Sequence, residues 1–525
     1  MLNWNNSSLF ATLVALIIIA PVFAIFYSAF LGDTSLWPHL FSTVLPRYIS
    51  NTIILMIGVG LLSSLLGIST AWVVTRYNFF GKNFFEWALL LPAAVPAYII
   101  AYTYTDFLEY AGPVQKIIRE FFNFKNAEEY WFPEIRSMEG AIFVMSFVLY
   151  PYIYMTTRAS FLTVPISFFQ TSLIYGRSSF FSVALPLARP GIIAGLALVL
   201  METVSDFGTV EYFALETLTL GVFNVWLGMN SLSGASQISS VLFIFVVVLI
   251  TIEYLARRNQ RFHEKSSGQN MIEAKTTSNV KKIICFFVCI IPIVIGFVIP
   301  VSVLLNFIFS GFSIIDFTQI FYTSFFSITL ALTGAFFVML ASIFLIIISQ
   351  YKSNNFQKSL IFLASCGYAL PGTILAVGMV IFLGWINKYL HLHLSYVAGG
   401  FIVLIFAYIV RFLAVGNASI RSGILKIHPN AMDASLTMGA GFYKGVKVVI
   451  MPLIFSNILI GGILVFVDIL KELPITLLLR PFNFETLATY VYQYASDELL
   501  QESSFAALII VVVGLGPIIF LNSAL

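Results

Sequence analysis

Four acidic residues of the chain fall at matched positions in two distant segments. Each pair follows a proline at intervals of 16 and 20 residues: Glu202 and Asp206 after Pro186, and Asp468 and Glu472 after Pro452. Side chains four residues apart share one face of a helix, and a carboxylate inside a membrane usually faces a cavity or a charged partner. Because oxygen ligands also suit hard cations, we expect these four acids to line a pathway or an outer gate.

The same acids could instead form ion pairs or lie at the outer membrane interface. A helix rises about 1.5 Å per residue, so each acid would lie about 24 to 30 Å from its proline, in the outer part of a membrane or at its edge. Lys471 and Arg480 are near enough in the sequence to pair with the second set, whereas the first set has no neighbouring base. Both interpretations stay open at this point.

Other residues that could do chemistry are few. The three cysteines are an odd number and lie inside apolar runs, so a disulfide scaffold and a zinc site are both unexpected. His391 and His393 could bind a metal at an outer loop, although a solvated pair is the simpler interpretation. The sequence has no G-x-x-x-x-G-K-[ST] loop for a nucleotide and no clustered catalytic residues for a membrane enzyme. We expect no enzymatic activity, no cofactor and no resident metal ion.

The composition indicates the environment of these residues. Hydrophobic residues make up 59% of the 525 positions and charged residues only 10%, with a mean hydropathy of +0.96. Soluble domains carry about 25% charged residues. The chain is therefore an integral membrane protein surrounded by lipid, and its net charge of +3 gives no reason to expect a nucleic-acid partner.

Long apolar runs predict the membrane-spanning helices. A bilayer core about 30 Å thick needs about 20 apolar helical residues. Twelve runs fit, at 9–30, 51–75, 86–108, 138–157, 190–213, 238–256, 283–309, 324–349, 359–386, 397–415, 455–479 and 504–524. The first lacks a basic flank and a small-residue cleavage site, so we expect it to be retained. The sequence predicts an all-α polytopic membrane protein.

The basic residues predict the orientation of these spans, because cytoplasmic loops keep Lys and Arg in excess. With the N-terminus inside, the inner loops hold 19 of the 27 basic residues but only 5 of the 24 acidic ones. Both termini are then cytoplasmic, in a bacterial inner membrane. The longest outer loop, about 109–137, is rich in aromatic residues, which favours a place at the membrane interface or under a partner.

The spans divide into two similar halves of six. We expect a first half at 1–256, a polar cytoplasmic linker at 257–282 and a second half at 283–525. Pro96 corresponds to Pro371, and the Glu-Thr-Leu sequence at 216–218 corresponds to 485–487. Since each half has an even number of spans, the repeat is parallel, and a pathway between the halves is the natural place for transport.

Each half also has a long inner loop between its fourth and fifth spans. In the second half, Asp433 is followed by Ala434 and Ser435, by Gly439 six residues after the acid, and by Pro452 after a hydrophobic run. This pattern resembles the coupling loop of binding-protein-dependent ABC importers. Small residues allow close approach to a partner, and the glycine permits a sharp turn into a second helix.

The first half departs from that pattern. Its loop has Gln170 where the second has an acid, followed by Thr171, Ser172 and Gly176, and the interval from Gly176 to Pro186 is three residues shorter. We therefore expect the two loops to dock unequally. A long inner loop in each half favours an ABC permease over an ion-coupled secondary transporter, which has no ATPase to engage.

The ends of the two halves indicate a narrower group. Residues 202–213 (ETVSDFGTVEYF) and 470–489 (LKELPITLLLRPFNFETLAT), together with Arg189-Pro190, resemble the fused two-half permeases of ferric-iron importers. The resemblance implies a cytoplasmic ATP-binding subunit in two copies and an extracytoplasmic substrate-binding protein. Permeases for thiamine, phosphonates or polyamines share this architecture, so those substrates remain alternatives.

Overall fold

The computed structural model describes residues 6–258, 278–390, 400–428 and 430–524. Eleven helices in these ranges are long and apolar enough to cross a membrane. The number becomes twelve if Lys82–Ala94 and Ala97–Phe122, which are bent by 88° at their junction, count as one span. The described part of the chain has no strand. The prediction of an all-α polytopic protein with about twelve spans is confirmed.

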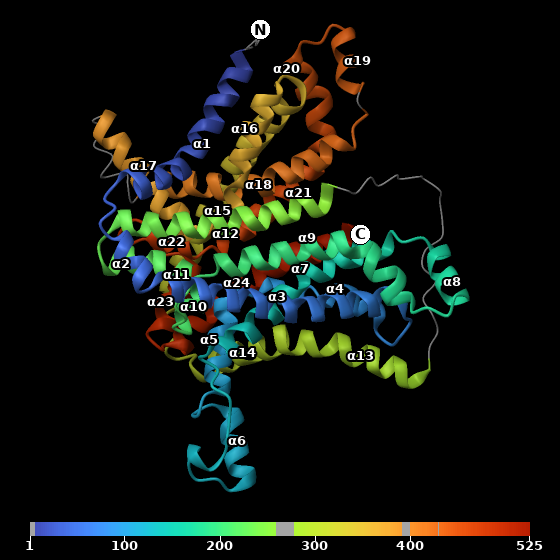
Figure 1. Cartoon of the computed structure of the whole chain (residues 1–525), viewed down its shortest axis with the longest axis vertical. Helices are drawn as coiled ribbons and strands as arrows, with labels where there is room; N and C mark the ends of the chain where they lie inside the picture. The colour runs from blue at the N-terminus through green and yellow to red at the C-terminus, as the bar shows by residue number, and fades with distance from the viewer. Residues whose placement is uncertain (1–5, 259–277, 391–399, 429, 525) are drawn as a thin grey trace. The chain divides into compact units, whose positions relative to one another are not determined.

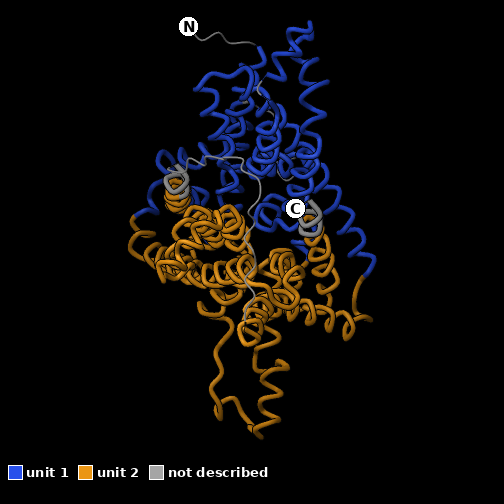
Figure 2. The backbone as a smooth tube through the Cα atoms, turned by 90° about the vertical axis from the view of Figure 1, so that its right-hand side faces the viewer, with its two compact units in different colours: residues 1–37, 222–240, 317–490 blue, residues 38–221, 241–316, 491–525 orange. Residues whose placement is uncertain are grey.

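The chain forms two compact units whose segments alternate along the sequence (Figure 2). Unit 1 contains Met1–Trp37, Val222–Ser240 and Phe317–Tyr490, and unit 2 contains Pro38–Gly221, Val241–Asp316 and Val491–Leu525. Each unit therefore combines the middle of one half with end segments of the other half. The predicted linker, 257–282, falls mostly on residues 259–277, and His391 and His393 fall on 391–399; all of these lie outside the described residues.

Three long helices form the centre of unit 2: α3 (Leu45–Arg76), α7 (Met138–Leu162) and α9 (Leu185–Ser205). Gly195 lets α9 approach α7 closely, because a methyl group at Gly195 would lie 2.7 Å from the Cα of Ile153. Small residues at such contacts are typical of membrane helices, whose packing relies on van der Waals contact rather than on the hydrophobic effect.

The remaining elements of unit 2 surround this centre (Figure 1). In chain order they are α4 (Lys82–Ala88), η1 (Leu91–Ala94), α5 (Ala97–Leu108), α6 (Pro113–Phe122), η2 (Ala127–Glu129), α8 (Ile166–Ile174), η3 (Phe180–Ala184), α10 (Gly208–Tyr212), α13 (Asn279–Ile293), η5 (Val294–Val298), α14 (Ile299–Ser310) and α24 (Leu500–Ala524). The amphipathic α6 extends away from the other helices of the unit. From the second half, α14 packs on α5, and Tyr104 of α5 donates a 2.7 Å hydrogen bond to the Ile295 carbonyl.

Unit 1 repeats this plan with α15 (Phe317–Tyr351), α18 (Phe401–Leu425) and α21 (Met451–Leu470) at its centre. The other elements of the unit are α1 (Asn6–Leu31), α16 (Asn355–Ser365), η6 (Cys366–Ala369), α17 (Gly372–Leu390), α19 (Ala431–Thr437), α20 (Phe442–Gly445), η8 (Val446–Ile450) and α22 (Pro474–Leu479). From the first half, α1 packs on α16 and α17, and the Gln357 amide donates to Ser8 and Thr12 of α1. Exchange of the first span is thus a feature of both units.

Four elements run from one unit into the other: α2 (Trp37–Ser42), α11 (Leu218–Phe223), α12 (Leu232–Arg258) and α23 (Leu487–Ser496). The π-helical segment η4 (Asn224–Gly228) lies within unit 1. The last span of the first half, α12, is thus divided between the units, whereas the last span of the second half, α24, lies wholly in unit 2.

The third span of the first half and its counterpart are broken, whereas the sequence predicted continuous helices at 86–108 and 359–386. A 3-10 turn ends at an extended residue, Val95 in one case and Leu370 in the other, and a proline follows each. Proline disfavours helical geometry in the residue before it and has no N–H to continue the ladder. Pro96 and Pro371 therefore set the same break in both halves.

Candidate functional site

The four predicted acids lie near two further helix ends. Helix α9 ends at Ser205 and α21 ends at Leu470, so Glu202 and Asp468 are helical whereas Asp206 and Glu472 follow the ends. The expectation that each pair shares one face of a continuous helix is wrong for this reason. The second acid of each pair, Asp206 or Glu472, instead caps the short helix that follows.

Asp206 caps the short helix α10. Its carboxylate accepts hydrogen bonds from the backbone N–H groups of Thr209 (2.9 Å) and Val210 (3.2 Å), and from the Thr209 hydroxyl (3.1 Å). The first N–H groups of a helix have no partner within the helix, so a side-chain acceptor at this place stabilises the helix start. Asp206 therefore fixes where the chain resumes helical structure after α9.

Glu472 does the same for α22. Its carboxylate accepts from the backbone N–H groups of Ile475 and Thr476, both at 3.2 Å, and from the Thr476 hydroxyl at 3.1 Å. The Thr476 hydroxyl also lies 2.6 Å from that of Tyr408 on α18. Glu472 is only 6% exposed, so this cap is part of the interior of unit 1.

The acids of the second half have basic neighbours. Lys471 Nζ lies 3.4 Å from Asp468 Oδ1, so this acid forms one of the ion pairs that the sequence left open as an alternative. Arg411 lies beside Glu472, since a methyl group on Gly372 would be 2.8 Å from Glu472 Oε1 and 3.0 Å from Arg411 Nη1. Arg411 lies in the middle of α18.

The first half lacks that arginine. Arg411 lies 28 residues before Gly439, and the residue 28 before Gly176 is Val148, which is buried in α7. Within the described part of the chain Asp206 makes no ion pair, and its electrostatic neighbour is the carboxylate of Glu202. The two halves thus share a cap but differ in charge.

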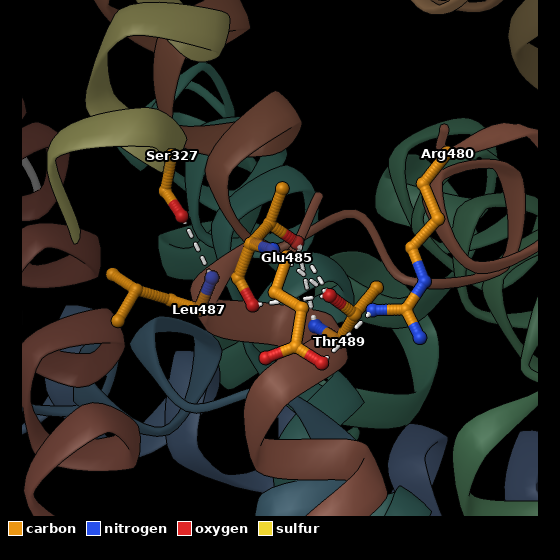
Figure 3. Close-up of polar contacts among 6 residues, drawn as sticks. Ser327, Arg480, Glu485, Leu487 and Thr489 are labelled. Atoms are coloured by element: carbon orange, nitrogen blue, oxygen red, sulfur yellow. Dashed lines mark hydrogen bonds and ion pairs between the residues drawn. The ribbon is translucent and has the colours of Figure 1, made fainter. Parts of the chain in front are cut away.

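The Glu-Thr-Leu segments are anchored identically in the two halves. In unit 1 the Leu487 N–H donates to Ser327 Oγ of α15 at 2.7 Å, beside an ion pair of 3.6 Å between Arg480 and Glu485 (Figure 3). Arg480 therefore pairs with Glu485 rather than with either of the two acids near which the sequence placed it. The Thr489 hydroxyl accepts from the Thr486 N–H and closes the turn before α23.

In unit 2 the Leu218 N–H donates to Thr52 Oγ1 of α3 at 3.0 Å. Arg47 and Glu216 form the accompanying ion pair at 2.8 Å. The same backbone group thus bonds to a hydroxyl on the equivalent helix of each unit. This agreement supports the residue correspondence between the halves.

Both predicted coupling loops have one backbone geometry. Gly176 follows α8 with φ +62°, and Gly439 follows α19 with φ +84°. The Gly176 N–H donates to Leu173 and the Arg177 N–H to Ser172; the Gly439 N–H donates to Leu436 and the Ala440 N–H to Ser435. Left-handed residues closing a helix in this way favour glycine because it has no Cβ. The shorter first loop keeps the turn that the sequence predicts for the second.

Side-chain exposure defines the face that each loop presents. Gln170, Thr171, Asp433 and Ala434 are exposed, as a docking face requires, but Ser172 and Ser435 point inward and donate to Phe169 and Met432 carbonyls. The sequence did not single out the apolar tips: Ile174, Tyr175 and Met438 are 83%, 75% and 89% exposed. A pocket of about 370 Å³ lies between α8 and η3, lined by Phe168, Tyr175 and Arg177 among others.

A π-helical segment joins each loop to the span that follows. Pro186 comes just after η3 and Pro452 just after η8, each at the start of the long helix. Proline is well tolerated in the first turn of a helix. The loop-closing prolines therefore mark the same structural point in both units.

One further cluster of charges belongs to the predicted outer loop. Arg136 forms ion pairs with Glu109 (2.7 Å) and Glu498 (3.4 Å), and it lies over the Tyr212 ring at 5.0 Å. Burial lowers the pKa of Arg136, but Tyr212 and the two carboxylates outweigh burial and raise the pKa above its usual value. The loop is thereby tied to the end of α10.

Comparison with known proteins defines the class. Residues 63–261 match the family described as binding-protein-dependent transport system inner membrane component. This match covers less than half of the chain, so it shows that this part is similar to inner-membrane permeases of binding-protein-dependent importers; the multi-pass helical fold agrees with it. Permeases of this class work with ATP-binding and substrate-binding proteins.

Similar proteins extend the match along the chain. The Fe(3+)-transport system permease protein FbpB 2 of Haemophilus influenzae is 24% identical over 493 residues, covering 92% of this chain and 91% of that protein. The ferric transport system permease protein FbpB of Actinobacillus pleuropneumoniae is 20% identical over 549 residues, covering 97% and 76%. The molybdenum transport system permease protein ModB of Haemophilus influenzae is 27% identical over 210 residues, covering 37% and 86%. The chain is similar over most of its length to the two ferric permeases and over one part to the molybdenum permease.

Proposed function

We propose that this permease carries ferric iron, delivered by an extracytoplasmic binding protein, across the bacterial inner membrane. The observation that carries the proposal is the similarity over 92% of the chain to a ferric permease, since the smaller molybdenum permease matches only 37%. The two loops of equal backbone geometry support an ATP-driven mechanism. An ion-coupled carrier would have no use for two such loops.

The loops indicate how the ATP-binding subunits engage. Each unit presents one short exposed helix, α8 or α19, closed by a left-handed glycine. Two equivalent loops are best served by two copies of the ATP-binding subunit, one on each. Both loops are then cytoplasmic, as are both termini, and the binding protein docks on the opposite side of the membrane.

The docking is unequal because the exposed residues differ. The first loop offers the neutral Gln170 and Thr171, whereas the second offers the charged Asp433 and the small Ala434. Apolar tips, Tyr175 in one loop and Met438 in the other, add contact area without charge. We expect the second loop to contribute more to retention of the ATP-binding subunit.

The acids of the two halves also have unequal roles. Asp206 and Glu472 position α10 and α22, but in the second half Lys471 and Arg411 compensate Asp468 and Glu472. Asp206, which makes no ion pair among the described residues, therefore provides the stronger negative field for a passing cation. We therefore assign the first pair of acids, Glu202 and Asp206, a role in the pathway. The second pair, Asp468 and Glu472, has a mainly structural role.

The test uses the complete complex in sealed vesicles with ATP enclosed on the side of the loops. Ferric iron loaded on the binding protein should stimulate ATP hydrolysis and accumulate on that side, while ferrous iron should not. Stimulation only by a binding protein loaded with thiamine, phosphonate, polyamine or molybdate would overturn the iron assignment and leave the permease class intact. Uptake that collapses with an ionophore at constant ATP would overturn the ATP-driven mechanism.

A further inference from the structure

A cluster of tyrosines in unit 2 lies outside every role described so far. Tyr98 and Tyr102 lie one helical turn apart on α5, and both are buried, at 5% and 3% exposed. The Tyr102 hydroxyl has no hydrogen-bond partner in the described structure. A buried polar group without a partner destabilises the folded state. Phenylalanine would fill the same space without this cost, so packing alone does not explain the hydroxyl of Tyr102.

The surroundings of Tyr102 are rich in oxygen. It interacts electrostatically with Tyr98, Tyr492, Glu211 and Tyr212, and its ring packs edge-on to that of Tyr212 at 4.4 Å. The Tyr492 hydroxyl is hydrogen-bonded to the Glu211 carboxylate. Three separate elements, α5, α10 and α23, therefore direct one carboxylate and several phenols to one place within unit 2.

The equivalent place in unit 1 has lost nearly all of these oxygens. Counting from Pro96 and Pro371, Tyr98 and Tyr102 correspond to Thr373 and Val377. Counting from the capping acids Asp206 and Glu472, Glu211 corresponds to Leu477, and counting from Leu218 and Leu487, Tyr492 corresponds to Phe223. The scaffold is repeated, but only one copy has the phenols and the carboxylate, so the backbone arrangement does not require them.

We infer that Tyr102, Glu211 and Tyr492 form a transient binding site for a hard trivalent cation on its way through the permease, with Tyr98 as a neighbouring fourth oxygen. Carboxylate and phenolate oxygens are hard ligands that suit such an ion. One carboxylate and two phenolates carry three negative charges, which balance Fe³⁺ and reduce the cost of holding it away from water. Each phenol that becomes a ligand releases one proton, because metals bind the deprotonated form.

This inference rests on the proposed ferric function, and a spectroscopic test separates the two. Phenolate bound to Fe³⁺ gives a visible charge-transfer band that neither component shows alone. Ferric nitrilotriacetate is titrated into the purified complex of permease and ATP-binding subunits, and the band and its midpoint are recorded. The wild-type complex should develop the band, and Tyr102→Phe and Tyr492→Phe should each weaken the band and shift its midpoint at least about tenfold. Glu211→Gln should shift the midpoint while keeping the band.

Two matched variants provide the controls. Tyr104→Phe removes a hydroxyl from the same helix, but that hydroxyl is bonded to the Ile295 carbonyl; Thr373→Val removes the hydroxyl at the equivalent place in unit 1. Both should keep the wild-type band and midpoint. Gel filtration and basal ATP hydrolysis report whether each variant is folded and assembled.

The outcomes distinguish the site from the function. If the complex imports ferric iron but shows no band, or if Tyr102→Phe leaves the midpoint and ferric uptake unchanged, the site is wrong and the ferric function stands. If vesicles import a different substrate and ferric iron produces no band, both the cation site and the ferric function are wrong. A band of wild-type strength in Tyr104→Phe, a weakened band in Tyr102→Phe and Tyr492→Phe, and a shifted midpoint with the band kept in Glu211→Gln together support the site.

Discussion

The capping acids of the two halves, Asp206 and Glu472, show how a repeated scaffold can keep its geometry while its charge diverges. Both carboxylates accept from two backbone N–H groups and a threonine hydroxyl at the start of a short helix. Glu472 has Arg411 beside it, whereas the corresponding place in unit 2 is Val148. The hydrogen bonds are the same in both units. Arg411 offsets the charge of Glu472, whereas no basic residue stands at the corresponding place near Asp206.

The same asymmetry extends beyond the caps. Unit 2, in which Asp206 makes no ion pair among the described residues, also has the buried phenols Tyr98 and Tyr102, while unit 1 has Thr373 and Val377. Negative charge and hard oxygen ligands therefore gather in one copy of the duplicated unit. Because a cation needs both, we expect unit 2 to bind the cargo and unit 1 to supply support.

Removing the compensating charge should have the largest effect. Arg411→Met leaves Glu472 buried without its basic neighbour, and loss of one partner from a buried charge pair costs about 3 to 5 kcal/mol. The thermal unfolding midpoint of the purified permease should fall steeply. Glu472→Gln in the same chain should restore most of the loss, because the amide oxygen can still cap α22. If the single and double variants unfold at the same temperature, Arg411 does not compensate Glu472.

A matched control is available in the same region. Lys471 pairs with Asp468 at 3.4 Å, but the side chains are 27% and 24% exposed. Partly exposed pairs contribute about 0 to 1 kcal/mol, so Lys471→Met should change the midpoint little. A large loss from Lys471→Met would reverse the ranking of the two bases.

The loop glycines should show the next largest effect. A β-branched side chain in the left-handed conformation costs about 1 to 2 kcal/mol, so Gly439→Val should deform the loop after α19. We expect ATP hydrolysis to continue while ferric uptake falls about tenfold, in line with that cost. Gly441→Ala is the control, because Gly441 has φ −68° and open space around its Cα. Coupled uptake unchanged by Gly439→Val would exclude this turn from coupling.

Neutralising the acids should give a smaller, graded effect. Glu202→Gln with Asp206→Asn keeps side-chain shape, and asparagine still caps a helix, so only charge is lost. Uptake of ferric iron should fall several-fold while assembly and basal ATP hydrolysis are retained. Asp468→Asn with Glu472→Gln should reduce uptake less, because bases already offset those charges. Equal loss in both double variants would remove the functional distinction between the halves.

The exposed loop residues should show the smallest effect. Asp433→Ala should weaken retention of the ATP-binding subunit in a pull-down by about 0.2 to 1 kcal/mol, as expected for an exposed charge. Gln170→Ala should weaken it less, since Gln170 carries no charge. Equal weakening by the two variants would show that the loops dock alike despite their different residues.

Much of the architecture could be predicted from local sequence. Runs of apolar residues locate the spans, and the repeated prolines and glycines locate the breaks and turns, because these residues restrict the backbone wherever they occur. The apolar runs do not reveal the helix breaks at Pro96 and Pro371, because hydropathy measures how apolar a segment is and not whether its helix axis changes direction. The early helix ends at Ser205 and Leu470 were missed for the same reason, so Asp206 and Glu472 were assigned to helical faces.

The sequence by itself determined that this chain is a helical membrane protein with repeated motifs and two similar loops, because composition, periodicity and repeated motifs are local properties. Only the tertiary structure decided that α1 packs with α16 and α17, that Arg411 reaches Glu472, and that Tyr102, Glu211 and Tyr492 meet. These contacts join residues tens to hundreds of positions apart. No local pattern encodes them, since they depend on how complete helices pack within each unit.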